Sequence, residues 1–197
     1  GGAGTGKTTV ALWAARAELE RPGKEKKRAL FLTFSRTAVE QISSRSRSVV
    51  SAVEDRIEVS TFHSFAYRLV RQFGYLTGAT GRDPSVQSAS EMKLLGRARE
   101  RLVYDDLAPL ARTIMEDPRV AALLAERWCL VVCDEFQDTG DGQWAILEWL
   151  SRNSRLLLLG DEHQLIYGFL ARTGVAPERM TSTRAWVDRM IELEPAS

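Results

Sequence analysis

The chain has 197 residues, of which 44% are hydrophobic and 27% are charged, as is usual for a globular domain. Its formal net charge of +1 excludes attraction of nucleic acid by bulk charge, so any contact with a phosphate backbone has to be local. No apolar run is long enough to cross a bilayer, and the first residues lack the basic and apolar segments of an export signal, so we expect a cytoplasmic protein with no membrane partner.

The first part of the chain alternates amphipathic helices with short apolar strands. We predict helices over residues 7–20, 37–45 and 62–73, and strands over residues 29–34 and 57–61. This alternation is typical of an α/β fold, in which a parallel sheet is covered by helices on both faces.

The composition changes after residue 74. Residues 77–90 are rich in Gly, Ser and Thr and end in Ser88 and Glu91, which have the spacing of a helix capping box. Residues 91–127 show helical periodicity and no strand signal. We therefore predict a small helical insertion over residues 75–127.

The sheet pattern resumes at residue 128. We predict strands over 128–133, 155–159 and 191–193, and helices over 142–151 and near 183–190. The main domain is thus expected to comprise residues 1–74 and 128–197. Cys129 and Cys133 lie four residues apart on a predicted strand and should face the same way, as buried reduced thiols rather than metal ligands.

The first eight residues fit the phosphate-binding pattern G-x-x-x-x-G-K-[ST]. These residues are Gly1, Gly2, Ala3, Gly4, Thr5, Gly6, Lys7 and Thr8. Glycines allow backbone N–H groups to point at phosphate oxygens, while Lys7 can reach the β- and γ-phosphates and Thr8 can ligate Mg²⁺. The alternative is a glycine-rich turn before a helix. The pattern normally follows a strand, so we expect the chain to be a fragment of a longer protein.

Two polar clusters follow predicted strands farther along the chain. Asp134 and Glu135 end the strand over 128–133, where α/β folds keep their ligand sites. Asp134 is a candidate Mg²⁺ ligand and Glu135 a candidate base for the attacking water, although two exposed acids at a strand end are the simpler alternative. Gln164, after the strand over 155–159, is a candidate sensor of the γ-phosphate.

The motifs together resemble those of the UvrD/Rep-like superfamily 1 helicases. Residues 134–139 (DEFQDT) resemble motif II of that family, DExQD(T/S), and residues 160–169 resemble motif III. Residues 32–38 (LTFSRTA) and 59–65 (VSTFHSF) are similar to motifs Ia and Ib. The motifs occur in the order of the family and cover essentially the whole chain, and the insertion over 75–127 falls where the family carries subdomain 1B.

This resemblance implies a P-loop NTPase with a RecA-like sheet, acting as an ATP-dependent helicase or translocase on single-stranded DNA in repair or recombination. It implies ATP and Mg²⁺ as cofactors, bound by Lys7, Thr8 and Asp134. Glu135 would activate water and Gln164 would sense the γ-phosphate.

The resemblance also implies four contacts with single-stranded or partly duplex DNA. The residues that match are Phe34, His63, Tyr167 and Phe169. Aromatic stacking on bases tolerates any sequence, which suits a motor. Phe34 could instead be a buried structural residue, and His63 could cap the helix after Thr61.

Leu170 departs from the family, which has arginine at that point of motif III, so coupling between the nucleotide and DNA sites is in question. Motifs IV to VI do not occur in these 197 residues, so we expect a second RecA-like domain of the same full-length protein as a partner, and little or no activity without it. The alternatives are a helicase-like subunit of a recombination nuclease, a nucleotide-dependent switch module without unwinding activity, and an inert product of a truncated gene.

Overall fold

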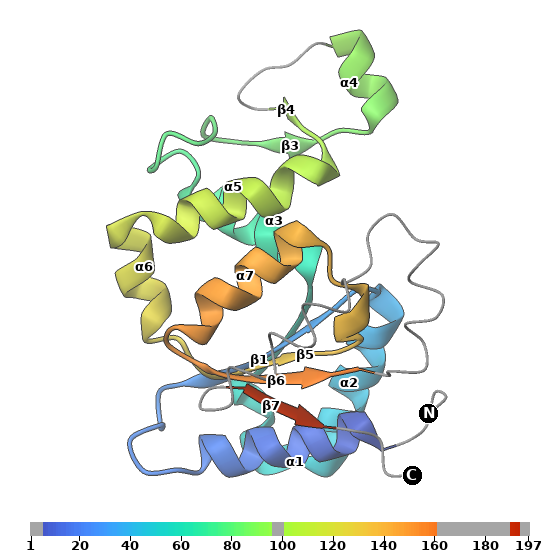
Figure 1. Cartoon of the computed structure of the whole chain (residues 1–197), viewed down its shortest axis with the longest axis vertical. Coiled ribbons are helices and arrows are strands. Elements are labelled where there is room, and N and C mark those ends of the chain that lie inside the picture. The colour runs from blue at the N-terminus through green and yellow to red at the C-terminus, as the bar shows by residue number, and fades with distance from the viewer. Residues whose placement is uncertain (1–5, 96–100, 161–189, 194–197) are drawn as a thin grey trace. The chain divides into compact units, whose positions relative to one another are not determined.

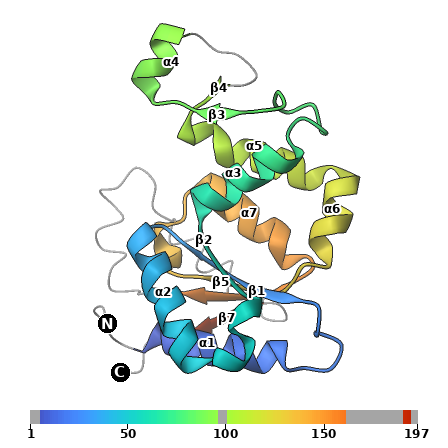
Figure 2. The ribbon, with the colours of Figure 1, turned by 180° about the vertical axis from the view of Figure 1, so that it is seen from behind.

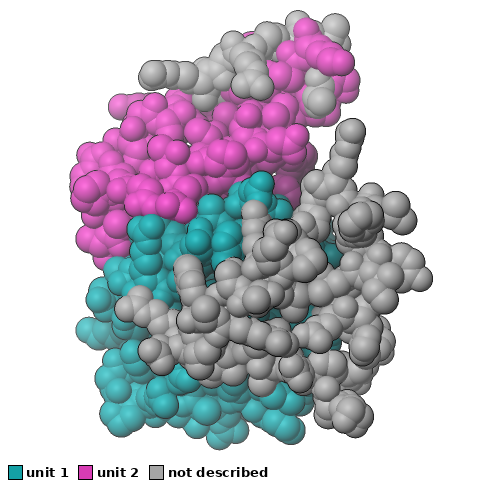
Figure 3. Space-filling model, in the orientation of Figure 1, with its two compact units in different colours: residues 1–61, 125–197 teal, residues 62–124 magenta. Residues whose placement is uncertain are grey.

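The computed structural model describes residues 6–95, 101–160 and 190–193 of the chain. The chain divides into two compact units, one made of residues 1–61 and 125–197 and the other of residues 62–124, which Figure 3 shows in two colours. Each unit is described below by itself.

The first unit is built on a sheet in which all neighbouring strands are parallel, in the order β2-β1-β5-β6-β7 (Figure 1). Its strands are β1 (Arg28–Thr33), β2 (Ile57–Thr61), β5 (Trp128–Cys133), β6 (Arg155–Leu159) and β7 (Met190–Leu193). All five strands were predicted from the sequence to within one residue at either end. The strand order leaves β5, which carries the candidate acids, in the middle of the sheet.

Helices cover both faces of this sheet. Helix α1 (Lys7–Leu19) and helix α2 (Arg36–Val49) lie on one face, and helix α7 (Asp141–Ser151) lies on the other, as both ribbon views show (Figures 1 and 2). A short 3-10 helix, η1 (Ser51–Arg56), leads from α2 into β2. The predicted α/β fold, with a parallel sheet and helices on both faces, is therefore confirmed.

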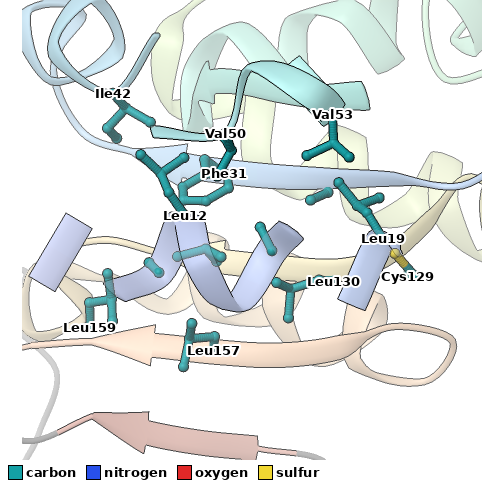
Figure 4. Packing of buried hydrophobic residues seen from close by; sticks show 14 residues of the cluster. Leu12, Leu19, Phe31, Ile42, Val50, Val53, Cys129, Leu130, Leu157 and Leu159 are labelled. Atoms are coloured by element: carbon teal, nitrogen blue, oxygen red, sulfur yellow. The ribbon is translucent and has the colours of Figure 1, made fainter. Parts of the chain in front are cut away.

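The core between α1 and the sheet fixes the position of the helix that follows the glycine loop. Leu12 and Ala15 of α1 are fully buried against Phe31 of β1 and Val132 of β5 (Figure 4). Burying a side chain such as leucine stabilises the fold by roughly 1.5–3 kcal/mol. Because α1 begins at Lys7, this packing also fixes the start of the helix relative to the strands.

A β-bulge in β5 changes the direction of one cysteine. Arg28 pairs with Trp128 whereas Ala29 pairs with Leu130, so Cys129 is an extra residue in the ladder. Cys129 consequently joins the buried cluster that contains Leu130 and Val132, while strand alternation turns Cys133 to the opposite face. The prediction that the two thiols face the same way is wrong. Burial raises the pKa of both thiols, as expected for protonated, reduced cysteines.

The second unit is mainly helical. Its helices are α3 (Phe62–Phe73), α4 (Ala89–Leu95), α5 (Tyr104–Glu116) and α6 (Pro118–Ala125). Helix α3 packs on α5, which is why it belongs to this unit although the sequence analysis placed it in the main domain. The predicted capping box exists, since the backbone N–H of Ser88 donates to Glu91 Oε2 at 2.8 Å and that of Glu91 donates to Ser88 Oγ at 3.2 Å.

Two short strands in this unit were not predicted. Strand β3 (Ser85–Val86), in the segment over 77–90 that was predicted to be a loop, pairs in parallel with β4 (Arg101–Leu102), in the segment over 91–127 where no strand was predicted. The predicted helix near 183–190 lies outside the described residues, except that residue 190 begins β7. Among the helices that the structure describes, none combines the length and apolar character needed to cross a membrane.

Candidate nucleotide-binding site

The end of the glycine loop leads directly into α1. Gly6 adopts a left-handed backbone conformation with φ +80°, and a Cβ placed there would meet nothing within 4 Å. The first turn of α1 contains no acidic side chain, so its backbone N–H groups and positive helix end favour an anion. Lys7 and Thr8 are the first two residues of this helix and are partly buried. Residues 1–5 of the predicted loop lie outside the described part of the chain.

The acidic pair lies where β5 ends, beside the end of β1. Leu32 of β1 pairs with Cys133 of β5, and the backbone N–H of Asp134 donates to the carbonyl of Leu32 at 3.0 Å. Asp134 and Glu135 are both partly buried. The carboxyl end of a central strand therefore presents two neighbouring acids, at the edge of the sheet where parallel α/β folds bind ligands.

The charge balance at Asp134 connects the acids to the glycine loop. Burial and the neighbouring charge of Glu135 raise the pKa of Asp134, whereas the backbone N–H of Glu135, 3.2 Å from Asp134 Oδ1, and the charge of Lys7 lower it. The charge of Lys7 thus acts on Asp134, which is 127 positions away in the sequence, as is consistent with the packing of α1 against β5.

Glu135 has an unusual backbone conformation. Its φ of 52° and ψ of 49° are left-handed, a conformation that costs a residue other than glycine about 1–2 kcal/mol. A short 3-10 helix, η2 (Phe136–Asp138), follows at once, and the backbone N–H of Asp138 donates to the carbonyl of Glu135 at 2.9 Å. The motif match predicted the identity of this acid but not its conformation, because glycine and asparagine are the usual left-handed residues.

The residues fit a magnesium ion bound together with a nucleotide. Among the described residues, no group of three or more His, Cys, Asp or Glu side chains is arranged to hold a metal. Mg²⁺ in nucleotide sites needs only one or two protein oxygens, because phosphates and water complete its shell. Thr8 and Asp134 supply a hydroxyl and a carboxylate of the required kind. Burial and the charge of Glu135 raise the pKa of Asp134.

Two of the four predicted DNA contacts fall on described residues. Phe34 follows β1 directly and is partly buried, and Ser35 after it caps α2 by accepting a hydrogen bond from the backbone N–H of Ala38 at 3.1 Å. His63 belongs to α3 in the second unit, where its exposed ring meets Tyr104 edge-on with the ring centroids 5.6 Å apart. Gln164, Tyr167 and Phe169 lie outside the described residues, as does Leu170.

Comparison with protein families gives a match to the AAA domain over residues 1–170, which include the glycine loop and both acids. The chain belongs to the AAA domain family. The match includes strands β1, β2, β5 and β6 of the parallel sheet and the motifs described above, whereas β7 lies beyond the matched residues.

Curated relatives of this AAA domain are helicases and helicase–nuclease subunits. It is 23% identical over 229 residues to the "ATP-dependent DNA helicase PcrA" of Leuconostoc citreum, covering 85% of the chain and 31% of that protein. It is 40% identical over 101 residues to the "RecBCD enzyme subunit RecB" of Mycobacterium tuberculosis, covering 46% and 9% respectively. It is 40% identical over 81 residues to the "Exonuclease/helicase subunit RexA" of Lactococcus lactis, covering 40% and 7%.

These relatives confirm the resemblance to UvrD/Rep-like superfamily 1 helicases that the motifs indicated. The AAA domain spans only 9% of the length of the RecB relative and 31% of that of PcrA.

Proposed function

We propose that this AAA domain binds ATP with Mg²⁺ and hydrolyses it as part of a motor that moves along single-stranded DNA. The observation that carries the proposal is the packing of α1, which begins at Lys7, against β5, which ends beside Asp134, with the charge of Lys7 acting on Asp134. The names of the relatives, which include a DNA helicase and an exonuclease/helicase subunit, support action on DNA, and we propose DNA repair or recombination as the setting. A cytoplasmic location is part of this proposal, because such a motor needs access to both ATP and DNA.

Each residue at the site has a chemical task in this proposal. Lys7 binds the β- and γ-phosphates, together with backbone N–H groups of residues 1–6 and the start of α1. Thr8 and Asp134 hold Mg²⁺, which when bound neutralises charge on the phosphates. Glu135 orients the attacking water and accepts its proton, and Gln164 contacts the γ-phosphate.

The proposed DNA track includes Phe34, which follows β1 at the same end of the strand as Leu32, the partner of Asp134. Its aromatic ring suits stacking on a base, a contact that does not depend on sequence. His63, Tyr167 and Phe169 complete the proposed set. Their matches to the helicase motifs support these assignments.

A second RecA-like domain of the same full-length protein is the proposed partner at the nucleotide. Arginines supplied across such sites commonly raise the rate of phosphoryl transfer by about 10³–10⁵. The 197-residue chain alone is therefore expected to bind ATP weakly and to hydrolyse it slowly.

Substitution of Glu135 in the intact protein tests the proposal. Glu135→Gln should abolish ATP hydrolysis stimulated by single-stranded DNA while ATP still binds. Glu40→Gln is the matched control, since Glu40 is an exposed acid on α2 and its loss should change neither property. Hydrolysis by Glu135→Gln at the wild-type rate would refute the role assigned to Glu135. If the wild-type protein hydrolyses ATP but does not move along single-stranded DNA, a nucleotide-dependent switch would be favoured instead.

The names RecB and RexA favour a second candidate, a helicase-like subunit of a recombination nuclease. ATP hydrolysis at the same site would then power the movement of DNA toward a nuclease. Purification of the intact protein with its bound partners separates the candidates. ATP-dependent degradation of linear duplex DNA, lost in Lys7→Ala and retained in the control Lys26→Ala, would identify the nuclease complex, whereas unwinding without degradation would identify a simple helicase.

A further inference from the structure

The turn that follows the acidic pair is closed by a buried hydroxyl group. Thr139 is completely buried, and its Oγ1 donates to the carbonyl of Phe136 at 2.8 Å. The backbone N–H of Thr139 donates to the same carbonyl at 3.1 Å. A carbonyl oxygen has two lone pairs, so it can accept both bonds, and Thr139 holds it from the side chain and the backbone at once.

The residue that Thr139 holds is itself anchored in the core. Phe136 is only 2% exposed, and its ring lies 5.6 Å from the ring of Trp144 on α7, measured between centroids, with the two planes tilted by 55°. Such ring pairs contribute stabilisation beyond their buried area. The backbone of Phe136 is therefore fixed at two points, by its own side chain and by the hydroxyl of Thr139.

This anchored turn begins at Glu135, whose left-handed conformation is unfavourable by itself. Such a conformation persists only where surrounding contacts hold it in place. Two of these contacts are the hydrogen bond from Asp138 N–H to the carbonyl of Glu135, at 2.9 Å, and the closure of the next turn by Thr139. A return of Glu135 to an extended backbone would change the direction of its carboxylate.

We propose that Thr139 is a positioning residue for ATP hydrolysis. Its hydroxyl closes the turn after β5, and this closure keeps Glu135 left-handed and so fixes the direction of its carboxylate. The inference rests on the proposed role of Glu135 as the base. Thr139 touches neither substrate nor metal in this account, and it acts only through the backbone of residues 135–138.

The hydroxyl can be isolated by two substitutions in the intact protein. Thr139→Ser keeps the hydroxyl and removes a methyl group, whereas Thr139→Ala removes both. Thr139→Ala should lower kcat for DNA-stimulated ATP hydrolysis about tenfold, as for loss of one hydrogen bond that matters in the transition state, with KM for ATP within about twofold of wild type. Thr139→Ser should retain most of kcat.

Ser151→Ala is the matched structural control. Ser151 is buried at the end of α7, and its hydroxyl also donates at 2.8 Å to the carbonyl three residues earlier, that of Glu148. Its loss should lower the melting temperature about as much as Thr139→Ala does and leave kcat unchanged. If Thr139→Ala and Ser151→Ala behave alike in kcat, the hydroxyl of Thr139 is only structural and the inference is overturned.

Two further measurements separate this inference from the proposed function. In a Glu135→Gln background, adding Thr139→Ala should not reduce the residual rate further, because the hydroxyl acts through Glu135. If Glu135→Gln hydrolyses ATP normally, the proposed function fails. Amide hydrogen exchange then still tests whether the hydroxyl closes the turn. The backbone amides of residues 138 and 139 should exchange about tenfold faster in Thr139→Ala than in Thr139→Ser. Equal exchange in these two variants would refute the positioning role.

Discussion

The backbone N–H of Asp134 donates a 3.0 Å hydrogen bond to the carbonyl of Leu32, one residue beyond the last paired residue of β5. The bond ties the first acid of the proposed nucleotide site to β1, the strand that leads into Phe34. The proposed metal ligand and the proposed base-stacking residue thus attach to one stretch of backbone. A shift of Asp134 on binding Mg²⁺ would therefore move the backbone at Leu32, which is two residues before Phe34.

Gly6 should be needed both for stability and for nucleotide binding. Gly6→Ala places a side chain at φ +80°, which should destabilise the fold by about 1–2 kcal/mol and, because Gly6 leads directly into Lys7 at the start of α1, weaken ATP binding. Gly23→Ala is the matched control, since Gly23 has φ +79° and equally open surroundings in a turn between α1 and β1. Gly23→Ala should lower the stability measured by thermal unfolding by a similar amount and leave ATP affinity unchanged. Equal ATP affinities in Gly6→Ala and Gly23→Ala would count against the proposed phosphate site.

Asp134→Asn should stabilise the nucleotide-free protein at neutral pH while removing Mg²⁺-dependent nucleotide binding. The folded-state pKa of Asp134 is raised by burial and by Glu135, so the folded protein holds this proton more tightly than the unfolded chain does. Its contribution to stability is therefore complete at pH values below the unfolded pKa and is lost as pH rises through the folded pKa. As pH rises through this range, the melting temperature of Asp134→Asn should fall less than that of the wild type. An unchanged pH profile would contradict the prediction.

Phe34→Ala should weaken binding of single-stranded DNA by about 1–3 kcal/mol, the usual loss when a stacking aromatic is removed. Fluorescence titration of the intact protein with an oligonucleotide measures this change. Trp13→Ala serves as control, because Trp13 is an aromatic residue of α1 that is 57% exposed and belongs to no DNA motif. A lower melting temperature with unchanged DNA affinity would instead assign Phe34 to the core.

Leu12→Ala should destabilise the first unit by about 2–5 kcal/mol, because Leu12 is fully buried between α1 and the sheet. Val10→Ala on the same helix should cost less than about 1 kcal/mol, since Val10 is 43% exposed. Chemical denaturation measures both values. Similar losses in the two variants would show that α1 does not pack as described.

The strands and the helices beside them could be predicted because their signals are local. Residues 128–133 and 156–159 are apolar runs, and residues 57–61 alternate between apolar and polar before Thr61; the structure has strands at all three places. Helix α2 continues four residues past its predicted end because Ser46 lies in the core, a polar residue that the hydrophobic pattern does not count. Strand β4 has only two residues, Arg101 and Leu102, too few to show any period.

The sequence predicted which residues form the candidate site but not their backbone conformation. The motifs identified Lys7, Asp134 and Glu135, but they indicated neither the left-handed backbone of Glu135 nor the pairing of the Phe136 ring with Trp144 on α7, a contact between residues that the motif pattern does not relate. The β-bulge at Cys129 was missed for a similar reason. It depends on how β5 pairs with β1, and strand alternation alone does not reveal pairing.

The bulge at Cys129 sits at the entrance to β5, and from Ala29 with Leu130 to Leu32 with Cys133 the two strands stay in step. A change of chain length upstream of β5 can therefore be absorbed at this point, before the strand reaches its acids. A change of length in residues 62–124 would then leave the pairing of β1 with β5 next to Asp134 unchanged. A longer or shorter insertion could evolve there without resetting the alignment of Asp134 with Leu32.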